Sequence, residues 1–188
     1  MAEPRNQLEA IMDHVAKGEG PDGVRRSIRV DAQGYLLPPP LRAGFRAEIG
    51  VVAGVGFAAE LIPPAGTKII VHGVFFTKPS ALVTVRLIKN SSASTDGTST
   101  NSTIIPLDSA RGSRGATVKL FTVVPTAGTS VGDLAEQVMD TTDWFWFPFG
   151  VDGEPPLVLH GSGETLAINV SAIATIAGFI SWSEEVEE

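Results

Sequence analysis

The order of apolar and polar residues changes character near residue 44. Before that point, four apolar residues recur at the i, i+3, i+4 and i+7 positions of one helical face: Leu8, Ile11, Met12 and Val15. Pro4 suits a helix start and Gly18 a helix stop, so the pattern predicts a helix over about residues 4–17. A helix this short is only marginally stable in water. Its apolar face therefore needs a cover, either from its own domain or from a neighbouring subunit.

The segment after this helix is dominated by turn-forming residues. Gly18–Gly23 combines glycines with a proline and an aspartate, which predicts a loop. Residues 25–37 fit a short hairpin around Ala32-Gln33-Gly34, and the three prolines at 38–40 stiffen the exit. We therefore expect residues 1–43 to form an N-terminal arm that is first helical and then an extended linker.

From about Phe45 onward the pattern is that of β-strands. Apolar and polar residues alternate with a period of two in 81–89 and in 164–171, which is typical of half-buried strands in antiparallel sheets. Ile69–Phe76 is apolar on both faces. That segment fits a central strand or a strand covered by another subunit.

Further segments have the length and composition of short strands: 47–61, 103–107, 117–124, 134–139, 144–149, 156–160 and 174–183. Eight to ten strands with turns between them predict an all-β fold, a jelly-roll-like antiparallel β-sandwich over residues 44–188. The Ser/Thr-rich run Asn90–Thr103 predicts a solvated loop, and so does 108–115. Glu184–Glu188 is interpreted as a solvated acidic tail.

Composition narrows the classes of function. The 188 residues contain no cysteine, which excludes disulfides, a thiol nucleophile and a thiolate metal site. The formal charge of -7 argues against nucleic acid as the main partner. No apolar stretch of about 20 residues supports a membrane span. The polar N-terminus lacks the apolar core of a signal peptide, so we expect synthesis in a cytoplasm.

No motif in the chain predicts catalysis. His14, His72 and His160 are each interpreted as structural, because none stands in a recognisable nucleophile arrangement with serine and aspartate. Gly54–Ala59 lacks the third glycine of a dinucleotide fingerprint. The acidic residues in 140–143 and 152–154 do not match a calcium-loop spacing. We expect no enzymatic activity, no cofactor and no metal site.

Two tryptophans and three phenylalanines gather in Trp144–Phe149. In a strand, Trp144 and Trp146 face one side and the phenylalanines the other. This arrangement predicts core packing on one side and a subunit interface on the other; the alternative is a platform that stacks sugar rings. The candidate interface residues are Leu8, Ile11, Met12, Val15, Phe75, Trp144, Trp146 and Phe149.

Several segments resemble small structural proteins of tailed bacteriophages. The likeness covers about residues 70–185 and rests on Phe76–Ser99, Ile105–Ser109, Ala116–Val118, Leu157–Asn169 and Ser181–Glu185. Arg29–Leu36 is similar to the sequence segment that precedes such domains. The chain departs from the pattern at residues 140–150, where its aromatic cluster replaces a less aromatic stretch.

The resemblance implies a virion building block, either a capsid-decorating or a head-associated protein. Such proteins form homo-oligomers, often trimers, and bind the major capsid protein or another virion protein. The alternative is a tail, collar or appendage protein that binds carbohydrate receptors through Trp144, Trp146 and the 90–103 loop. The expected location is the virion, with no nucleic-acid or membrane partner. The resemblance leaves open the oligomer number and the position on the particle.

Overall fold

The computed structural model describes residues 44–53, 56–107, 115–150, 155–161 and 163–187, and the backbone of four short strands before residue 44. The chain divides into two units, Met1–Leu41 and Arg42–Glu188. The helix predicted over 4–17 lies outside the described residues except for Lys17, and so do the candidate interface residues on it.

The first unit contains two short antiparallel pairs. Strand β1 (Lys17–Glu19) pairs with β2 (Arg25–Ser27), and β3 (Arg29–Val30) pairs with β4 (Leu36–Leu37). The second pair agrees with the predicted hairpin. The loop predicted from residue 18 begins later, because Gly18 is in β1, where backbone pairing needs no side chain.

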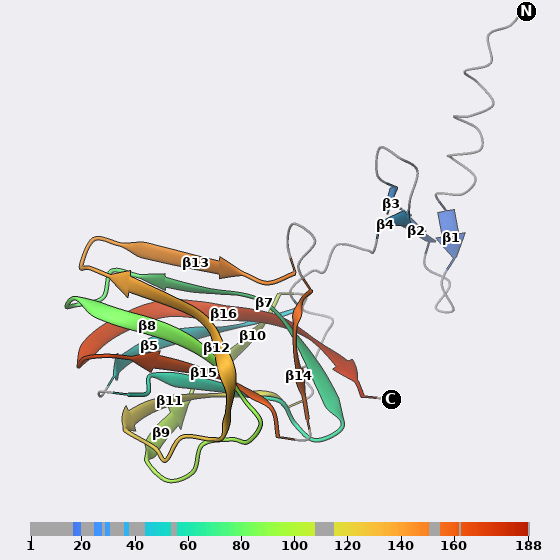
Figure 1. The fold of residues 1–188 in the computed structure, drawn as a ribbon. Coiled ribbons are helices and arrows are strands. Elements are labelled where there is room, and N and C mark those ends of the chain that lie inside the picture. The colour runs from blue at the N-terminus through green and yellow to red at the C-terminus, as the bar shows by residue number, and fades with distance from the viewer. Residues whose placement is uncertain are drawn as a thin grey trace, which may run out of the picture. The chain divides into compact units, whose positions relative to one another are not determined.

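The second unit is a sandwich of two antiparallel six-stranded sheets, which lie face to face in Figure 1. The first sheet has the order β10 (Ile104–Pro106), β5 (Phe45–Ala53), β16 (Ala174–Val186), β7 (Thr67–Thr77) and β13 (Trp144–Pro148), and β14 (Leu157–His160) also pairs with β7. The second sheet has the order β12 (Ser130–Met139), β8 (Val83–Asn90), β15 (Thr165–Val170), β6 (Ala59–Ile62), β11 (Thr117–Val123) and β9 (Thr98–Asn101).

Strands from the two halves of this unit pair in reverse order. In the first sheet β5 pairs with β16 and β7 with β13, and in the second sheet β6 pairs with β15 and β8 with β12. The predicted all-β antiparallel sandwich is confirmed.

The core lies between the two sheets, where the period-two positions meet. Val83, Val85 and Leu87 of β8 are buried, as their alternation predicted. Leu166, Ile168 and Val170 of β15 are buried in the same cluster.

Strand β7 is central in the first sheet, as its apolar sequence predicted. Its register against β16 shifts at Ser181/Trp182, so one extra residue, His72, is accommodated beside them. Val71 and Val74 are therefore both fully buried although they are an odd number of residues apart.

Three local predictions need correction. The segment 47–61 is two strands in different sheets, β5 and β6, and Gly56 between them has a positive φ of 113° that a turn requires. The predicted loop 90–103 contains β9, an edge strand of β-branched and polar residues whose four side chains are all exposed.

The third correction concerns the predicted acidic tail at 184–188. Strand β16 continues to Val186, which pairs with Thr67 of β7. The side chains of this segment are engaged: Glu185 pairs with Lys68 at 3.0 Å, and Glu187 with His160 at 2.7 Å. Charged partners on β7 and β14 thus stabilise this acidic segment at the end of β16.

A buried carboxylate holds the 91–97 segment against the outer side of the second sheet. Glu60 of β6 is fully buried. It accepts hydrogen bonds from the Thr165 hydroxyl at 2.7 Å and from the Ser94 backbone amide at 3.1 and 3.2 Å. Phe57 and Phe121 stack edge to face beside it, with centroids 5.8 Å apart.

Candidate functional site

The outer surface of the first sheet carries a group of aromatic side chains that we call the aromatic face: Phe75, Trp144, Trp146 and Phe179. They come from three neighbouring strands, β13, β7 and β16. Trp144 is 70% exposed and Trp146 is 40% exposed. The opposite side of the same sheet packs in the core. Large exposed aromatic side chains on a packed sandwich are typical of an interaction surface.

A glycine allows Trp146 to lie across β7. Trp146 pairs with Phe75 in the β13–β7 ladder, and its ring covers Gly73, where an added Cβ would overlap the indole. The ring therefore reaches Phe179 on β16, with centroids 6.0 Å apart. Phe75 and Phe179 stack at 5.2 Å with planes 28° apart. The three rings form one continuous layer.

Two charged residues of β5, Arg46 and Glu48, border this layer of rings. The Cζ of Arg46 lies 3.5 Å from the centroid of the Phe179 ring, a close cation–π contact. The Nε atom of Arg46 is buried and has no hydrogen-bond partner among the residues that the structure describes. Glu48 is exposed, and it stands opposite Phe179 in the β5–β16 ladder.

The structure brings together three of the four candidate interface residues that it describes. Phe75, Trp144 and Trp146 share the outer side of the sheet, whereas Phe149 is half-buried against the core and meets Phe147 edge to face at 4.9 Å. Sequence reasoning missed Phe179 and Arg46. Phe179 had one available signal, because it alternates with the buried Ile180 and therefore points outward.

We predict that Gly73→Ala lifts the Trp146 ring from the sheet. The new methyl group occupies the space of the indole, and the ring is the movable end of a side chain, so the free energy of unfolding should fall by only about 1 kcal/mol. Tryptophan emission should shift to longer wavelength. Gly50→Ala is the control, because an added Cβ there meets nothing within 4 Å. Identical spectra for the two variants would contradict the placement of Trp146.

The Ser/Thr-rich segment does not lie beside the tryptophans. Strand β9 is one edge of the second sheet, next to β11, and β12 is the opposite edge of that sheet. Strand β13 follows β12 in the chain and is an edge of the first sheet. Within the sandwich, Figure 1 shows β9 at the bottom and β13 at the top. The structure thus separates the two elements that a shared carbohydrate site would need.

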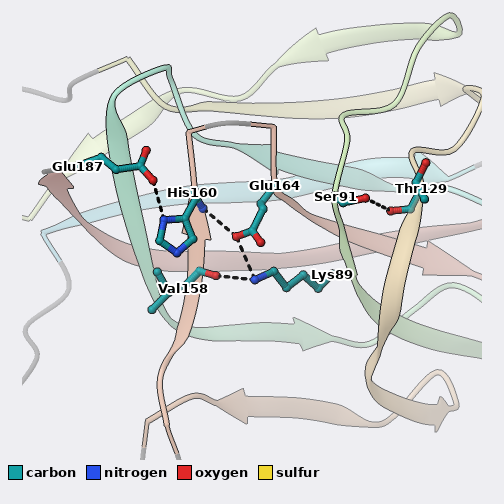
Figure 2. Close-up of polar contacts among 7 residues, drawn as sticks. All are labelled: Lys89, Ser91, Thr129, Val158, His160, Glu164 and Glu187. Atoms are coloured by element: carbon teal, nitrogen blue, oxygen red, sulfur yellow. Dashed lines mark hydrogen bonds and ion pairs between the residues drawn. The ribbon is translucent and has the colours of Figure 1, made fainter.

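A second polar group lies beside the start of β7, which pairs with β14 on one side and with the end of β16 on the other, and Figure 2 shows its contacts. Lys89 Nζ is 2.9 Å from Glu164 and donates to the Val158 carbonyl at 3.1 Å. His160 Nδ1 lies 2.7 Å from Glu187, and the His160 amide donates to Glu164 at 3.0 Å. This network ties β8, β14 and β16 together.

Burial and hydrogen bonding have opposite effects on the pKa of the Glu164 carboxyl group. Partial burial alone would raise the pKa of Glu164, but hydrogen bonds from Lys89 and the His160 amide, with the charge of Lys89, hold that pKa below its usual value. An open hollow of about 410 Å³ adjoins the network, lined by Lys68, His160, Glu185, Val186 and Glu187. Its charged groups pair with one another, so a charged ligand there would have to break these pairs.

One serine–histidine contact has the distance of a nucleophile and its base. His72 Nε2 lies 3.1 Å from the Ser183 hydroxyl on the outer side of the first sheet. A serine nucleophile also needs a group that orients the histidine. Among the residues that the structure describes, no carboxylate hydrogen-bonds the second ring nitrogen of His72. The contact is therefore interpreted as structural.

We predict that His72 makes the fold less stable in weak acid. Burial lowers the pKa of His72 below its ordinary 6.5, so the unfolded chain binds this proton more readily than the folded one. Neutral His72 therefore makes its full contribution to the free energy of unfolding above pH 6.5. This contribution is lost as the pH falls through 6.5 toward the pKa of His72 in the folded chain. Urea unfolding about one pH unit on either side of 6.5 tests this. The stability difference between the two pH values should be smaller in His72→Gln, and an unchanged difference would contradict the assignment.

The acidic residues near the β12–β13 turn are occupied by local hydrogen bonds. Asp140 accepts from the Thr142 amide and hydroxyl, both at 2.7 Å, and these bonds lower the pKa of Asp140. Asp143 accepts from the Asp140 amide at 2.9 Å. Residues 152 and 154 lie outside the described part of the chain. Within that part, no cluster of three or more His, Asp or Glu side chains could hold a metal ion.

Comparison with protein-family models, with curated proteins and with solved structures gives no match. No helix in the described ranges is long and apolar enough to cross a membrane.

Proposed function

We propose that this chain is a non-catalytic structural component of a virus particle, a capsid-decorating or head-associated protein that acts as a homo-oligomer. The observation that carries the proposal is the aromatic face, because a sandwich with a complete core gains nothing as a monomer from exposing two tryptophans. The resemblance of several segments to phage structural proteins supports a virus particle as the assembly to which the chain belongs. We expect a trimer that binds the major capsid protein or another virion protein.

The strand pairing supports a finer description of the fold. Reverse-order pairing of β5 to β8 with β12, β13, β15 and β16 is the arrangement of a jelly roll, so we class the sandwich as jelly-roll-like. Jelly rolls occur in viral capsid domains and in lectins. The architecture is therefore compatible with the proposal and does not decide it alone.

The proposed role requires no reaction and no cofactor. The candidate catalytic groups on the described surface are held in contacts that stabilise the sheet: His72 with Ser183, and His160 with Glu187. The proposed location is the virion, after synthesis in the host cytoplasm. Neither nucleic acid nor membrane is a proposed partner, and the charge of -7 supports the first exclusion.

Purified particles from the virus that encodes the chain provide the test. Quantitative mass spectrometry should find the chain in a fixed ratio to the major shell protein, and electron cryo-microscopy should show it as ordered density on the head. A chain that is abundant in infected cells and missing from purified particles would overturn the proposal.

The exposed Trp144 favours one second candidate, a carbohydrate-binding appendage. A glycan array separates the two. Binding that Trp144→Ala abolishes and that Val138→Ser leaves intact would favour the appendage, since Val138 is 55% exposed on the other sheet. No binding above background would leave the structural role as the explanation of the aromatic face.

A further inference from the structure

The aromatic face continues into a second, chemically different half. Cross-strand pairs run from Trp146 through Phe75 and Phe179 to Glu48, and from Gly73 through Ser181 and Arg46 to Ile105. Five strands about 4.8 Å apart make this surface about 20 Å wide. One end presents exposed tryptophans, and the other presents Arg46, Glu48 and Ile105, which is 42% exposed.

Among the described residues, the two charged side chains of this surface have no ion-pair partner. Arg46 and Glu48 are on the same side of β5, yet neither takes part in an ion pair of the described residues. The buried Nε of Arg46 has no acceptor among them. Arg46 as a whole is only half-buried, so a carboxylate that arrives at this surface would form a charge-assisted pair with its guanidinium.

Some of the charged groups on the second sheet are satisfied within the chain. On its outer side Arg86 pairs with Glu136 at 2.8 Å, and the buried Glu60 is capped by Ser94 and Thr165. Phe57 and Phe121 there are almost completely buried. Only the outer side of the first sheet combines exposed tryptophans with an unpaired cation and an unpaired anion, among the residues described.

This combination makes the surface complementary to itself. A partner of one charge would satisfy either Arg46 or Glu48 and repel the other, whereas a second copy offers a carboxylate to each guanidinium and a guanidinium to each carboxylate. A second copy also offers aromatic rings to cover the tryptophans. Symmetric self-contacts of this kind are the commonest route to homo-oligomers.

We propose that the aromatic face is the surface by which one copy of this chain binds another, with Arg46 of one copy paired to Glu48 of the next. The inference rests on the proposed homo-oligomeric function and specifies its interface. It applies to a two-fold contact, which makes two such pairs, and to a ring, which makes one at each interface.

Sedimentation velocity of the full chain and of charge-exchange variants tests the pairing. Arg46→Glu and Glu48→Arg each place like charges opposite one another, so each should raise the concentration at which half the chain is assembled by about tenfold or more. An equimolar mixture of the two variants should assemble more strongly than either alone. The double variant carrying both changes should also recover, because the opposite charges are restored in exchanged positions.

Two further variants separate this interface from general effects. Trp144→Ser should weaken assembly with little effect on folding, because that side chain is mostly exposed, and Val138→Ser on the second sheet should leave assembly unchanged. Circular dichroism confirms that each variant is folded.

The outcomes distinguish the interface from the function. Assembly that all face variants leave unchanged would overturn this interface while self-assembly stands. Failure of recovery in both the mixture and the double variant would overturn the Arg46–Glu48 pairing. A wild-type chain that stays monomeric at every concentration would overturn both the interface and the homo-oligomer. A monomer that binds isolated shell protein through Trp144 would assign the face to that partner.

Discussion

Replacement of Trp182 by alanine is expected to lower the free energy of unfolding by about 3–5 kcal/mol. Trp182 is fully buried, and its ring packs against Phe45 with centroids 6.1 Å apart. Its indole N–H donates to Glu184 at 3.0 Å. Alanine leaves a large cavity between the sheets and removes this donor. Single domains are stable by about 5–15 kcal/mol, so the loss is a large share of the total.

Urea unfolding followed by circular dichroism measures this effect. Ile173→Ala is the control, because Ile173 precedes the same strand, is 67% exposed and should change stability by about 0.5 kcal/mol or less. Equal losses in the two variants would mean that Trp182 does not fill the core as described.

The second large effect is expected from Glu60→Ala. This change leaves the Ser94 amide and the Thr165 hydroxyl without their acceptor in a buried position, and two such donors together cost about 2–4 kcal/mol. Glu60→Gln keeps a carbonyl oxygen for one donor and should lose less. The loss should be local as well as global, because the 91–97 segment depends on this carboxylate.

Hydrogen exchange at the Ser94 amide provides the local measurement. Exchange should become faster in Glu60→Ala and change less in Glu60→Gln. Glu136→Ala is the control, since that carboxylate pairs with Arg86 at the exposed surface. Ser94 protection that is equal in Glu60→Ala and the wild type would contradict the role of Glu60.

Sequence pattern predicted the fold well where one face of a strand is buried. The alternation in β8 and β15 located both strands and their inward residues. The aromatic run at Trp144–Phe149 placed the tryptophans and the phenylalanines on opposite sides of a strand but did not show which side faces outward. It failed for β9, because an exposed edge strand has no apolar face to alternate. It also failed for the end of β16, whose glutamates looked solvated until β7 and β14 supplied their partners.

The candidate site was predictable only in part. Trp144 and Trp146 stood out because aromatic residues were concentrated in one strand. Phe179 and Arg46 join them through pairings between segments that are far apart in the chain, and no local pattern encodes such pairings. Glu60 was missed for a related reason. A glutamate beside a buried strand position normally points to water, and only the 91–97 segment folding over it makes it buried.

The mass of the full chain in solution, measured by light scattering from low to high micromolar concentration, tests the proposed self-assembly most directly. We expect a whole multiple of the chain mass, with a trimer favoured, that persists on dilution through this range. A single chain mass at every concentration would contradict a homo-oligomer assembled through the aromatic face.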